Sequence, residues 1–308
     1  MTEFLTAPAL SGMPLAVMDA CIRELVRRGG PDIPEWPAFD ALAAEIYRRH
    51  CCGQLAPEEL SRLRAAFGEV FSPETVPGHI ITKPHGYPGD FEIIDRIYRV
   101  QVTANPLLRN WDRYCLTRPV ARAVRNRKLY FRRMLRYQSL LREGRLEVLN
   151  LASGPGRDML EHFQEHGPGR VHIDCLEQDP AAVAYAERLC GGYPEAVRFI
   201  TGNALAFKPD KQYHFIWSAG LFDYFPDAVF RRLLRRLLPA VAPGGQLVIG
   251  NFSEANPNRG LMHLLDWELH YRSPDRLVDL AVRCGVPRER VSIGREPEGI
   301  NLFLHIQG

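Results

Sequence analysis

The stretch EVLNLASGPGRDMLEHF, residues 147–163, combines a short apolar run, a small-residue turn and a helix-like pattern. Gly154 and Gly156 lie in the turn, between a predicted strand and a predicted helix. In α/β proteins this order presents backbone N–H groups to a nucleotide. Glu177 closes the next predicted strand, about 20 residues after the glycines, where nucleotide-binding folds place the acid that holds ribose hydroxyls. Asn203, after the third predicted strand, carries an amide that can bond an adenine edge, so the spacing predicts a nucleotide site.

A second group of reactive side chains lies in the segment TKPHGYPGDFEIIDRIY, residues 82–98. Its glycines and prolines combine backbone freedom with stiffness, which suits a loop that folds over a ligand. His85 and Tyr87 are predicted catalytic residues, as a base or in positioning, and Asp90 is predicted to contact the substrate. The ring of Tyr87 would stabilise a nearby cation by about 0.5–2 kcal/mol. The alternative is a surface turn that links two helices.

Two further stretches follow predicted strands, at the edge where a substrate would lie: AGLFDYFPD at 219–227 and NRGLMHLLDWELHYRS at 258–273. Tyr224 in the first and Tyr271 in the second complete the predicted catalytic set. The leucines of the second stretch fit core packing equally well. The residues predicted to bind the substrate, besides Asp90, are Asp223, Asp266, Trp267 and Arg272.

A helical part and a β-rich part must position these side chains. Residues 1–142 show helical periodicity and almost no strand signal, so they predict an α-helical cap. Its helices are expected at about 15–28, 38–50, 57–71, 90–101 and 118–142. Residues 143–308 alternate short strands with amphipathic helices, which favours βαβ units and a parallel sheet in an α/β fold. The strands are expected at 147–151, 171–176, 197–201, 213–218 and 246–251, with an antiparallel pair at 291–306.

From residue 146 to the end, the sequence resembles the class I S-adenosylmethionine-dependent methyltransferases. VAPGGQLVI at 241–249 is similar to the segment that leads into the family's fifth strand, and the closing antiparallel hairpin is a family trait. The resemblance implies a Rossmann-like, seven-stranded, mostly parallel sheet with an antiparallel final strand, and S-adenosyl-L-methionine as cofactor. The positions that it implies for cofactor contact are Asn150, Ala152, Ser153, Gly154, Gly156, Glu177, Gln178, Asn203, Ala204 and Ser218.

Three of these positions depart from the family pattern, which usually has Asp or Glu at Asn150, Gly at Ala152 and Asp at Asn203. Asn150 cannot accept a charge-assisted hydrogen bond from the cofactor ammonium. In the preceding basic helix, Arg125 or Arg127 is predicted to pair with the cofactor carboxylate, because a guanidinium suits bidentate carboxylate recognition. The other basic residues of that helix are expected to form a solvated face.

Residues 82–98 and the segment RPVARAVRNRKLYF at 118–131 are similar to a subgroup with an N-terminal helical cap. The subgroup includes fatty hydroxy-acid methyl ester synthases and azetidine-2-carboxylate synthases. The first hypothesis is therefore O- or N-methylation of a small molecule in bacterial secondary metabolism. The second is cyclisation of S-adenosylmethionine to azetidine-2-carboxylate, in which its amine attacks its γ-carbon and methylthioadenosine leaves. The neutral Asn150 suits this reaction, because a carboxylate there would keep the amine protonated. The third is a non-catalytic S-adenosylmethionine-binding module.

Composition limits the partners. The chain has 308 residues and a net charge of +3, without the basic excess of a typical nucleic-acid binder. It also lacks the Pro-Pro and Pro-Cys motifs of nucleic-acid methyltransferases, so no nucleic acid is predicted. No apolar run approaches the roughly 20 residues of a membrane helix, and the start lacks a secretory pattern, so a cytoplasmic protein without a membrane partner is predicted. A small-molecule substrate and a homo-oligomer are compatible with these features.

The seven cysteines are scattered and show no metal-binding spacing, so no metal is predicted. No function is assigned to the pair Cys51 and Cys52.

Overall fold

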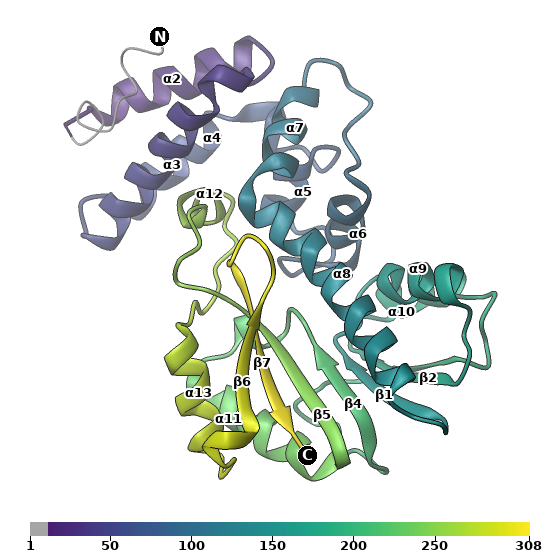
Figure 1. The fold of residues 1–308 in the computed structure, drawn as a ribbon. Coiled ribbons are helices and arrows are strands. Elements are labelled where there is room, and N and C mark those ends of the chain that lie inside the picture. The colour runs from purple at the N-terminus through teal and green to yellow at the C-terminus, as the bar shows by residue number, and fades with distance from the viewer. Residues whose placement is uncertain (1–11) are drawn as a thin grey trace. The chain divides into compact units, whose positions relative to one another are not determined.

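The computed structural model describes residues 12–308, and the chain forms two compact units (Figure 1). The helical unit holds the described residues up to Arg122 together with Pro257–Glu268. The sheet unit holds Ala123–Asn256 and Leu269–Gly308. Residues 123–142, assigned from the sequence to the helical cap, thus group with the sheet, and residues 257–268 group with the helices.

The described part of the helical unit contains helices and no strand. They are α2 (Leu15–Arg27), α3 (Trp36–Cys51), α4 (Pro57–Ala65), α5 (Val76–Thr82), α6 (Phe91–Arg99), α7 (Arg109–Thr117) and α12 (Arg259–Leu264), with 3-10 turns η2 (Ile33–Glu35) and η3 (Gly68–Phe71). The helix expected over 57–71 is shorter, because it ends at Ala65 and continues as a 3-10 turn. Edge-to-face contacts of Phe39 with Trp111 and Tyr114, at centroid distances of 5.4 and 5.1 Å, form the centre of its core.

The short helix α12 packs tightly on α3 although it comes from the connection between two strands. A Cβ at Gly260 would lie 2.5 Å from the carbonyl carbon and oxygen of Ala43. Only glycine permits this approach of the two backbones. Gly260 therefore fixes residues 257–268 in the helical unit.

The sheet unit is a single seven-stranded sheet with the order β3-β2-β1-β4-β5-β7-β6. Its strands are β1 (Leu146–Leu151), β2 (Val171–Glu177), β3 (Val197–Thr201), β4 (Tyr213–Ser218), β5 (Val241–Phe252), β6 (Val291–Arg295) and β7 (Asn301–Gln307). β7 pairs antiparallel with β5 and β6, and the other pairs are parallel. The predicted seven-stranded Rossmann-like sheet with its antiparallel end is confirmed.

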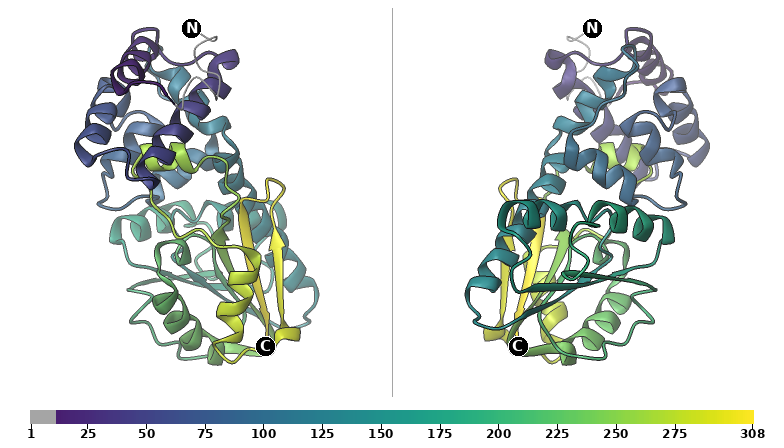
Figure 2. Two further views of the ribbon diagram at one scale, coloured as in Figure 1. Left: turned by 90° about the vertical axis from the view of Figure 1, so that its left-hand side faces the viewer. Right: turned by 90° about the vertical axis from the view of Figure 1, so that its right-hand side faces the viewer.

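Helices cover both faces of this sheet, as Figure 2 shows. They are α8 (Pro119–Leu140), α9 (Arg157–His166), α10 (Pro180–Leu189), α11 (Asp227–Leu237) and α13 (Pro274–Val282), with 3-10 turns η4 (Phe222–Tyr224), η5 (Leu238–Ala240) and η6 (Arg288–Arg290). Apolar residues of α11 and α13 share one core cluster with Leu247 and Ile249, while those of α8 and α9 share the other with Val248. This alternation along β5 is what a strand buried on both faces requires.

Among the described helices, none is long and apolar enough to cross a bilayer. Cys51 and Cys52 are exposed at the end of α3, and all seven cysteines are free thiols.

Candidate functional site

The loop between β1 and α9 contains three residues with left-handed backbone. The φ angle is +52° at Ala152, +58° at Gly154 and +73° at Gly156, which caps the N-terminus of α9. Glycine adopts this conformation freely, whereas a residue with a Cβ is strained there by about 1–2 kcal/mol. Ala152 is therefore strained, and its N–H donates to the Leu176 carbonyl of β2 at 2.8 Å.

The two glycines of this loop have different surroundings. A Cβ at Gly156 would lie 3.1 Å from Ala186 Cβ and 3.2 Å from Met159 Cε, so this glycine lets α9 pack closely on α10. A Cβ at Gly154 would meet no described neighbour within 4 Å. Open space over a backbone that leads into a helix N-terminus suits a bound ligand.

Glu177 ends β2 with a buried carboxylate that holds the glycine loop. Its Oε2 accepts a hydrogen bond from Gly154 N at 3.0 Å, and Oε1 accepts from Gln178 N at 2.8 Å and Asp179 N at 3.1 Å. Burial raises the pKa of Glu177, against the lowering effect of these three N–H groups. A carboxylate offers about four acceptor positions, so Glu177 has capacity left for a ligand hydroxyl.

Asn150 lies beneath the loop, buried on the sheet face that α9 covers. Its Nδ2 is 3.9 Å from Met159 Sδ, and Cys175 Sγ lies 3.2 Å from the same sulfur. Cys175 is also the residue opposite Asn150 in β2. The amide therefore contacts sulfur at the position where the family usually has a carboxylate.

The other predicted cofactor positions lie at the carboxyl ends of the strands. Ser218, the last residue of β4, is fully buried and donates to Leu151 O at 3.3 Å. Asn203 is exposed after β3, and its Oδ1 accepts from Leu205 N at 2.8 Å. Three further positions differ in exposure: Ser153 is buried, Ala204 is half-buried and Gln178 is exposed.

Arg127 projects from α8 to the end of β4. Its Nη1 donates to Ala219 O at 3.2 Å, and a Cβ at Gly220 would lie 3.0 Å from the same nitrogen. Burial raises the pKa values of Asp158 and Asp223, and the positive charge of Arg127 offsets part of that increase. Arg127 thus lies where α8, the start of α9 and the loop after β4 converge. Arg125, two positions earlier, projects to a different side of α8.

Two buried carboxyl groups interact electrostatically with Arg127. Burial raises the pKa of Asp158, in the first turn of α9, to about 6. It raises the pKa of Asp223, in η4, to about 7, although Asp223 Oδ1 accepts from Phe252 N at 2.6 Å. Asp158 escaped the sequence analysis because it resembles an ordinary helix-capping acid. Its burial beside Arg127 depends on α8, which no local pattern around residue 158 reveals.

Arg272, predicted to bind substrate, has its guanidinium buried inside the sheet unit. Its Nη1 donates to Asn251 Oδ1 at 2.6 Å, its Nε to Asp227 at 2.9 Å and its Nη2 to Phe225 O at 2.5 Å. These contacts tie the loop after β4 to the end of β5. A direct contact of Arg272 with substrate stays a prediction, as it does for the half-buried Tyr224 and Tyr271 on the same loops.

The predicted lid residues belong to the helical unit. Asp90 caps α6 and accepts from Glu92 N and Ile93 N, and both of its oxygens contact His79 Nε2, at 3.0 and 2.9 Å. Both side chains of this pair are buried. His85 and Tyr87, in the loop between α5 and α6, are partly exposed. His79 was not predicted as a site residue, because its partner lies eleven residues away on a different helix.

Asp266 and Trp267 also belong to the helical unit. Asp266 has φ +56° and forms ion pairs with Lys83, which has φ +49°, and with Arg64 at 3.4 Å. Trp267 is buried. The stretch predicted as one substrate segment is thus divided between the two units after Glu268.

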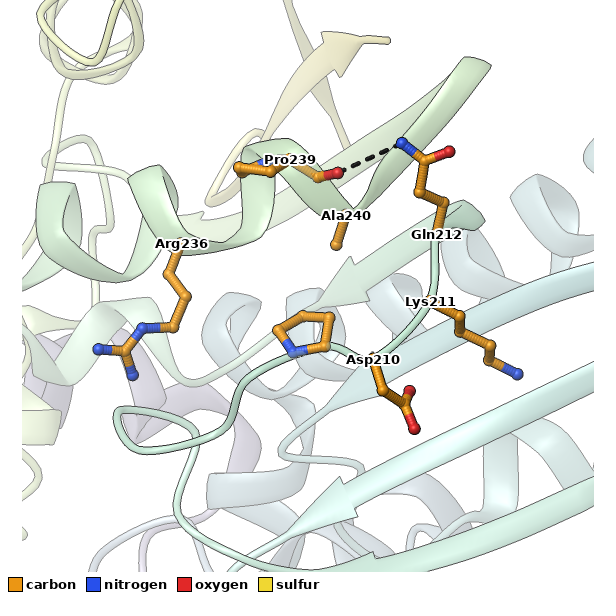
Figure 3. A pocket seen from close by; sticks show the side chains of 7 residues that line it. Asp210, Lys211, Gln212, Arg236, Pro239 and Ala240 are labelled. Carbon is orange, nitrogen blue, oxygen red and sulfur yellow. Dashed lines mark hydrogen bonds between the residues drawn. The ribbon is translucent and has the colours of Figure 1, made fainter.

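A hollow of about 260 Å³ lies elsewhere in the sheet unit (Figure 3). It is lined by Pro209, Asp210, Lys211, Gln212, Arg236, Pro239 and Ala240. These residues precede β4 and β5, at the amino ends of the strands, whereas ligands of such sheets bind at the carboxyl ends. The glycine loop, at the carboxyl ends of the strands, is therefore the candidate site. Within residues 12–308, no cluster of three or more His, Cys, Asp or Glu side chains could hold a metal ion.

Comparison with known proteins matches about a third of the chain to a family model. Residues 148–245 match the model of a family described as a methyltransferase domain. No curated protein matches the chain. A solved structure, a possible exported protein from Bordetella parapertussis, is similar with 18% identity and a TM-score of 0.59, over 99% of this chain and 97% of that one. At this identity the similarity shows the fold alone.

Two further structures are similar with lower scores. The S-adenosylmethionine-dependent methyltransferase SibL, in its apo form, has 14% identity and a TM-score of 0.48, over 97% of this chain and 96% of that one. The N-methyltransferase NodS from Bradyrhizobium japonicum, in complex with S-adenosyl-L-homocysteine, has 15% identity and a TM-score of 0.44, over 71% and 97%. Residues 148–245 of the sheet unit therefore match a methyltransferase domain, and the sheet has the Rossmann-like strand order that the sequence predicts.

Proposed function

We propose that the sheet unit binds S-adenosylmethionine at the glycine loop and that the chain transfers its methyl group to a small molecule. The observation that carries the proposal is the junction of Gly154 and Glu177. The carboxylate accepts from the Gly154 N–H, and the space over Gly154 is open. An acid and an open glycine loop at adjacent strand ends fit the ribose and the methionine chain of this cofactor.

Arg127 is the residue that we assign to the cofactor carboxylate. Its guanidinium is buried, and Nη1 donates to a carbonyl oxygen at the end of β4. A guanidinium presents five donors in a planar fork, so it suits bidentate binding of a carboxylate. Arg125 is the weaker candidate because it projects to another side of α8.

When bound, S-adenosylmethionine supplies an electrophilic methyl group. The protein then has to orient the acceptor, exclude water and remove a proton where the acceptor carries one. Tyr224 and Tyr271 lie on the loops after β4 and β5, which is the edge of the sheet unit that holds the glycine loop. His85 and Tyr87 of the helical unit stay in the proposed catalytic set. The net charge of +3 supports a small acceptor in preference to a nucleic acid.

Calorimetry with S-adenosylmethionine and S-adenosylhomocysteine tests the binding half of the proposal. Glu177→Gln should weaken binding about 10- to 100-fold, the value of a hydrogen bond to a charged group. Glu187→Gln, an exposed residue on α10 with the same change of charge, is the matched control and should bind as the parent does. Circular dichroism of both variants checks that they fold. Absence of binding heat for the parent, or parental affinity of Glu177→Gln, would contradict the proposal.

Cyclisation of S-adenosylmethionine is the second candidate, and the surroundings of Asn150 favour it. This residue is neutral and contacts Met159 sulfur, and burial raises the pKa of Asp158, the residue that precedes Met159. A neutral side chain at this position, in place of a carboxylate, favours loss of the proton from the substrate amine. The amine nitrogen would bond to the γ-carbon while the carbon–sulfur bond breaks, with the electron pair leaving on methylthioadenosine.

Incubation of the purified chain with S-adenosylmethionine alone separates these reactions. Methylthioadenosine together with a cyclic amino acid, formed without any acceptor, would refute the methyltransferase proposal. Absence of both products would refute the cyclase. A binding module without catalysis would gain support if alanine at Tyr87 and Tyr271 left every tested activity unchanged.

For the compartment we propose the cytoplasm, which the seven free thiols support because cytoplasmic proteins keep their cysteines reduced.

A further inference from the structure

Helix α8 carries an unbalanced positive charge. Its 22 residues contain seven Lys or Arg and no Asp or Glu. The neighbouring helix α9 neutralises part of this charge, because Glu161 pairs with Lys128 at 2.6 Å and with Arg132 at 2.7 Å. Arg133 and Arg136 form no ion pair with any described residue, and both are exposed.

Large exposed apolar side chains precede and follow these two arginines along α8. The exposed fraction is 41% for Leu129, 56% for Tyr137, 66% for Leu140 and 59% for Leu141. Positions 129, 133, 136 and 140 recur at intervals of three and four residues, so they form one stripe along the helix. The stripe thus mixes cations with leucines and a tyrosine, which an ordinary solvated face does not. We call it the outer α8 face.

We propose that the outer α8 face binds the surface of an anionic lipid bilayer. A helix that lies in a membrane interface presents Lys and Arg beside Leu and aromatic residues, and each cation near an anionic leaflet contributes about 1 kcal/mol. Tyrosine suits this interface because its ring is apolar and its hydroxyl stays in contact with water.

Other occupants fit the outer α8 face less well. A second copy of the chain, packed face to face, would bring Arg133 and Arg136 against their own copies, and like charges in contact oppose association. A nucleic acid would use the arginines but leave Leu140 and Leu141 in water. The absence of an apolar run long enough to cross a bilayer had predicted no membrane partner. A helix that binds the surface needs no such run.

Vesicle flotation of the full chain tests this proposal, with vesicles of equal parts phosphatidylserine and phosphatidylcholine compared with pure phosphatidylcholine. We expect the parent to float with the anionic vesicles and not with the neutral ones. The double variant Arg133→Gln/Arg136→Gln should lower the partition coefficient about 30-fold, from about 1 kcal/mol for each charge removed. Leu140→Gln, which keeps helix propensity, should lower it about tenfold through lost apolar burial.

The matched control is Arg232→Gln/Arg235→Gln on α11, which removes two exposed arginines from another helix of the same unit. It should bind anionic vesicles as the parent does. The proposal is overturned if the parent does not bind them, if the control weakens binding as much as the α8 variants, or if the face proves to bind an oligonucleotide or a second copy. Analytical ultracentrifugation and an oligonucleotide gel shift report those last two outcomes. Binding of S-adenosylmethionine is measured separately and does not depend on this result.

Discussion

Gly154 and Gly156 are two residues apart in one loop, yet the structure predicts opposite consequences for the same substitution. At Gly156 an added methyl group meets Ala186 and Met159, at 3.1 and 3.2 Å. At Gly154 it points into open space. Gly156→Ala should therefore damage the fold, and Gly154→Ala should damage ligand binding.

The free energies follow from two contributions. Both positions have positive φ, +58° and +73°, so alanine costs about 1 kcal/mol of unfolding free energy at each. Only Gly156→Ala adds overpacking between α9 and α10, which costs about another 1–3 kcal/mol. We expect a total of about 2–4 kcal/mol for Gly156→Ala and about 1 kcal/mol for Gly154→Ala. The Gly154 N–H, which donates to Glu177, is unchanged by the second substitution.

Gly154→Ala, the more stable of the two variants, should bind the cofactor more weakly than Gly156→Ala does. A methyl group at Gly154 would occupy the space that we assign to the cofactor, and a steric conflict of that size weakens binding about tenfold or more. Urea unfolding gives the stabilities, and calorimetry with S-adenosylmethionine, at a temperature where both variants are folded, gives the affinities. If Gly154→Ala bound the cofactor as tightly as the parent does, the open space over this residue would not be the cofactor site.

Three further outcomes are expected. Asp223→Asn removes a carboxyl group whose pKa is raised by burial from 3.8 to about 7. Because the folded state holds that proton more tightly than the unfolded state, the unfolding free energy of the parent should fall by up to about 4 kcal/mol relative to this variant as pH rises from about 4 to 7. Urea unfolding across that pH range measures the difference. Gly260→Ala places a methyl group 2.5 Å from the Ala43 carbonyl, so hydrogen exchange should show loss of protection in α12 and α3 while the sheet stays protected. His79→Ala leaves the buried Asp90 without its imidazole partner and should cost about 2–3 kcal/mol in thermal unfolding, with no such loss for the exposed carboxyl variant Glu187→Gln.

Most of the sheet was predictable, because its strands are short stretches rich in apolar residues and bounded by turn residues. The five strands expected between 147 and 251 are all present, and β5 starts earlier than expected because Val241 already pairs with Tyr213 ahead of the glycines at 244 and 245. Local pattern predicts such elements well, since buried parallel strands have little tolerance for polar residues.

The division of the chain into two units was harder to predict from the sequence than the sheet. Residues 257–268 are a connection between two strands in the sequence, yet they fold with helices about 200 positions earlier, as the hydrogen bonds from Arg64 to the carbonyls of His263 and Leu264 show. The close approach of Gly260 to Ala43 has no signature in either segment alone. Long-range packing of this kind is set by the fit of two surfaces, which one sequence does not display.

In the candidate site, too, some residues could be predicted from local sequence and others could not. Gly154, Gly156 and Glu177 were identified because their spacing follows one strand and one helix, which is local information. The surroundings of Arg272 were not identified, because its guanidinium donates to Phe225, Asp227 and Asn251, which lie more than 20 residues before it in the sequence. A charged residue that is a candidate for ligand binding in the sequence can thus have its hydrogen-bond donors occupied by other residues of the protein.

Helix α8 illustrates the same difference between what the sequence predicts and what the folded structure determines. Its sequence is uniformly basic, and a charge count treats its arginines alike. The structure separates them by the period of the helix: Arg127 lies buried at the end of β4, Lys128 and Arg132 are paired with α9, and Arg133 and Arg136 remain on the outer side. The three groups are under different physical demands, because a buried cation needs an anionic or carbonyl partner whereas an exposed one does not. Removing Arg127 should therefore affect ligand binding and fold together, while removing Arg133 and Arg136 should leave both intact and change only what the outer α8 face binds.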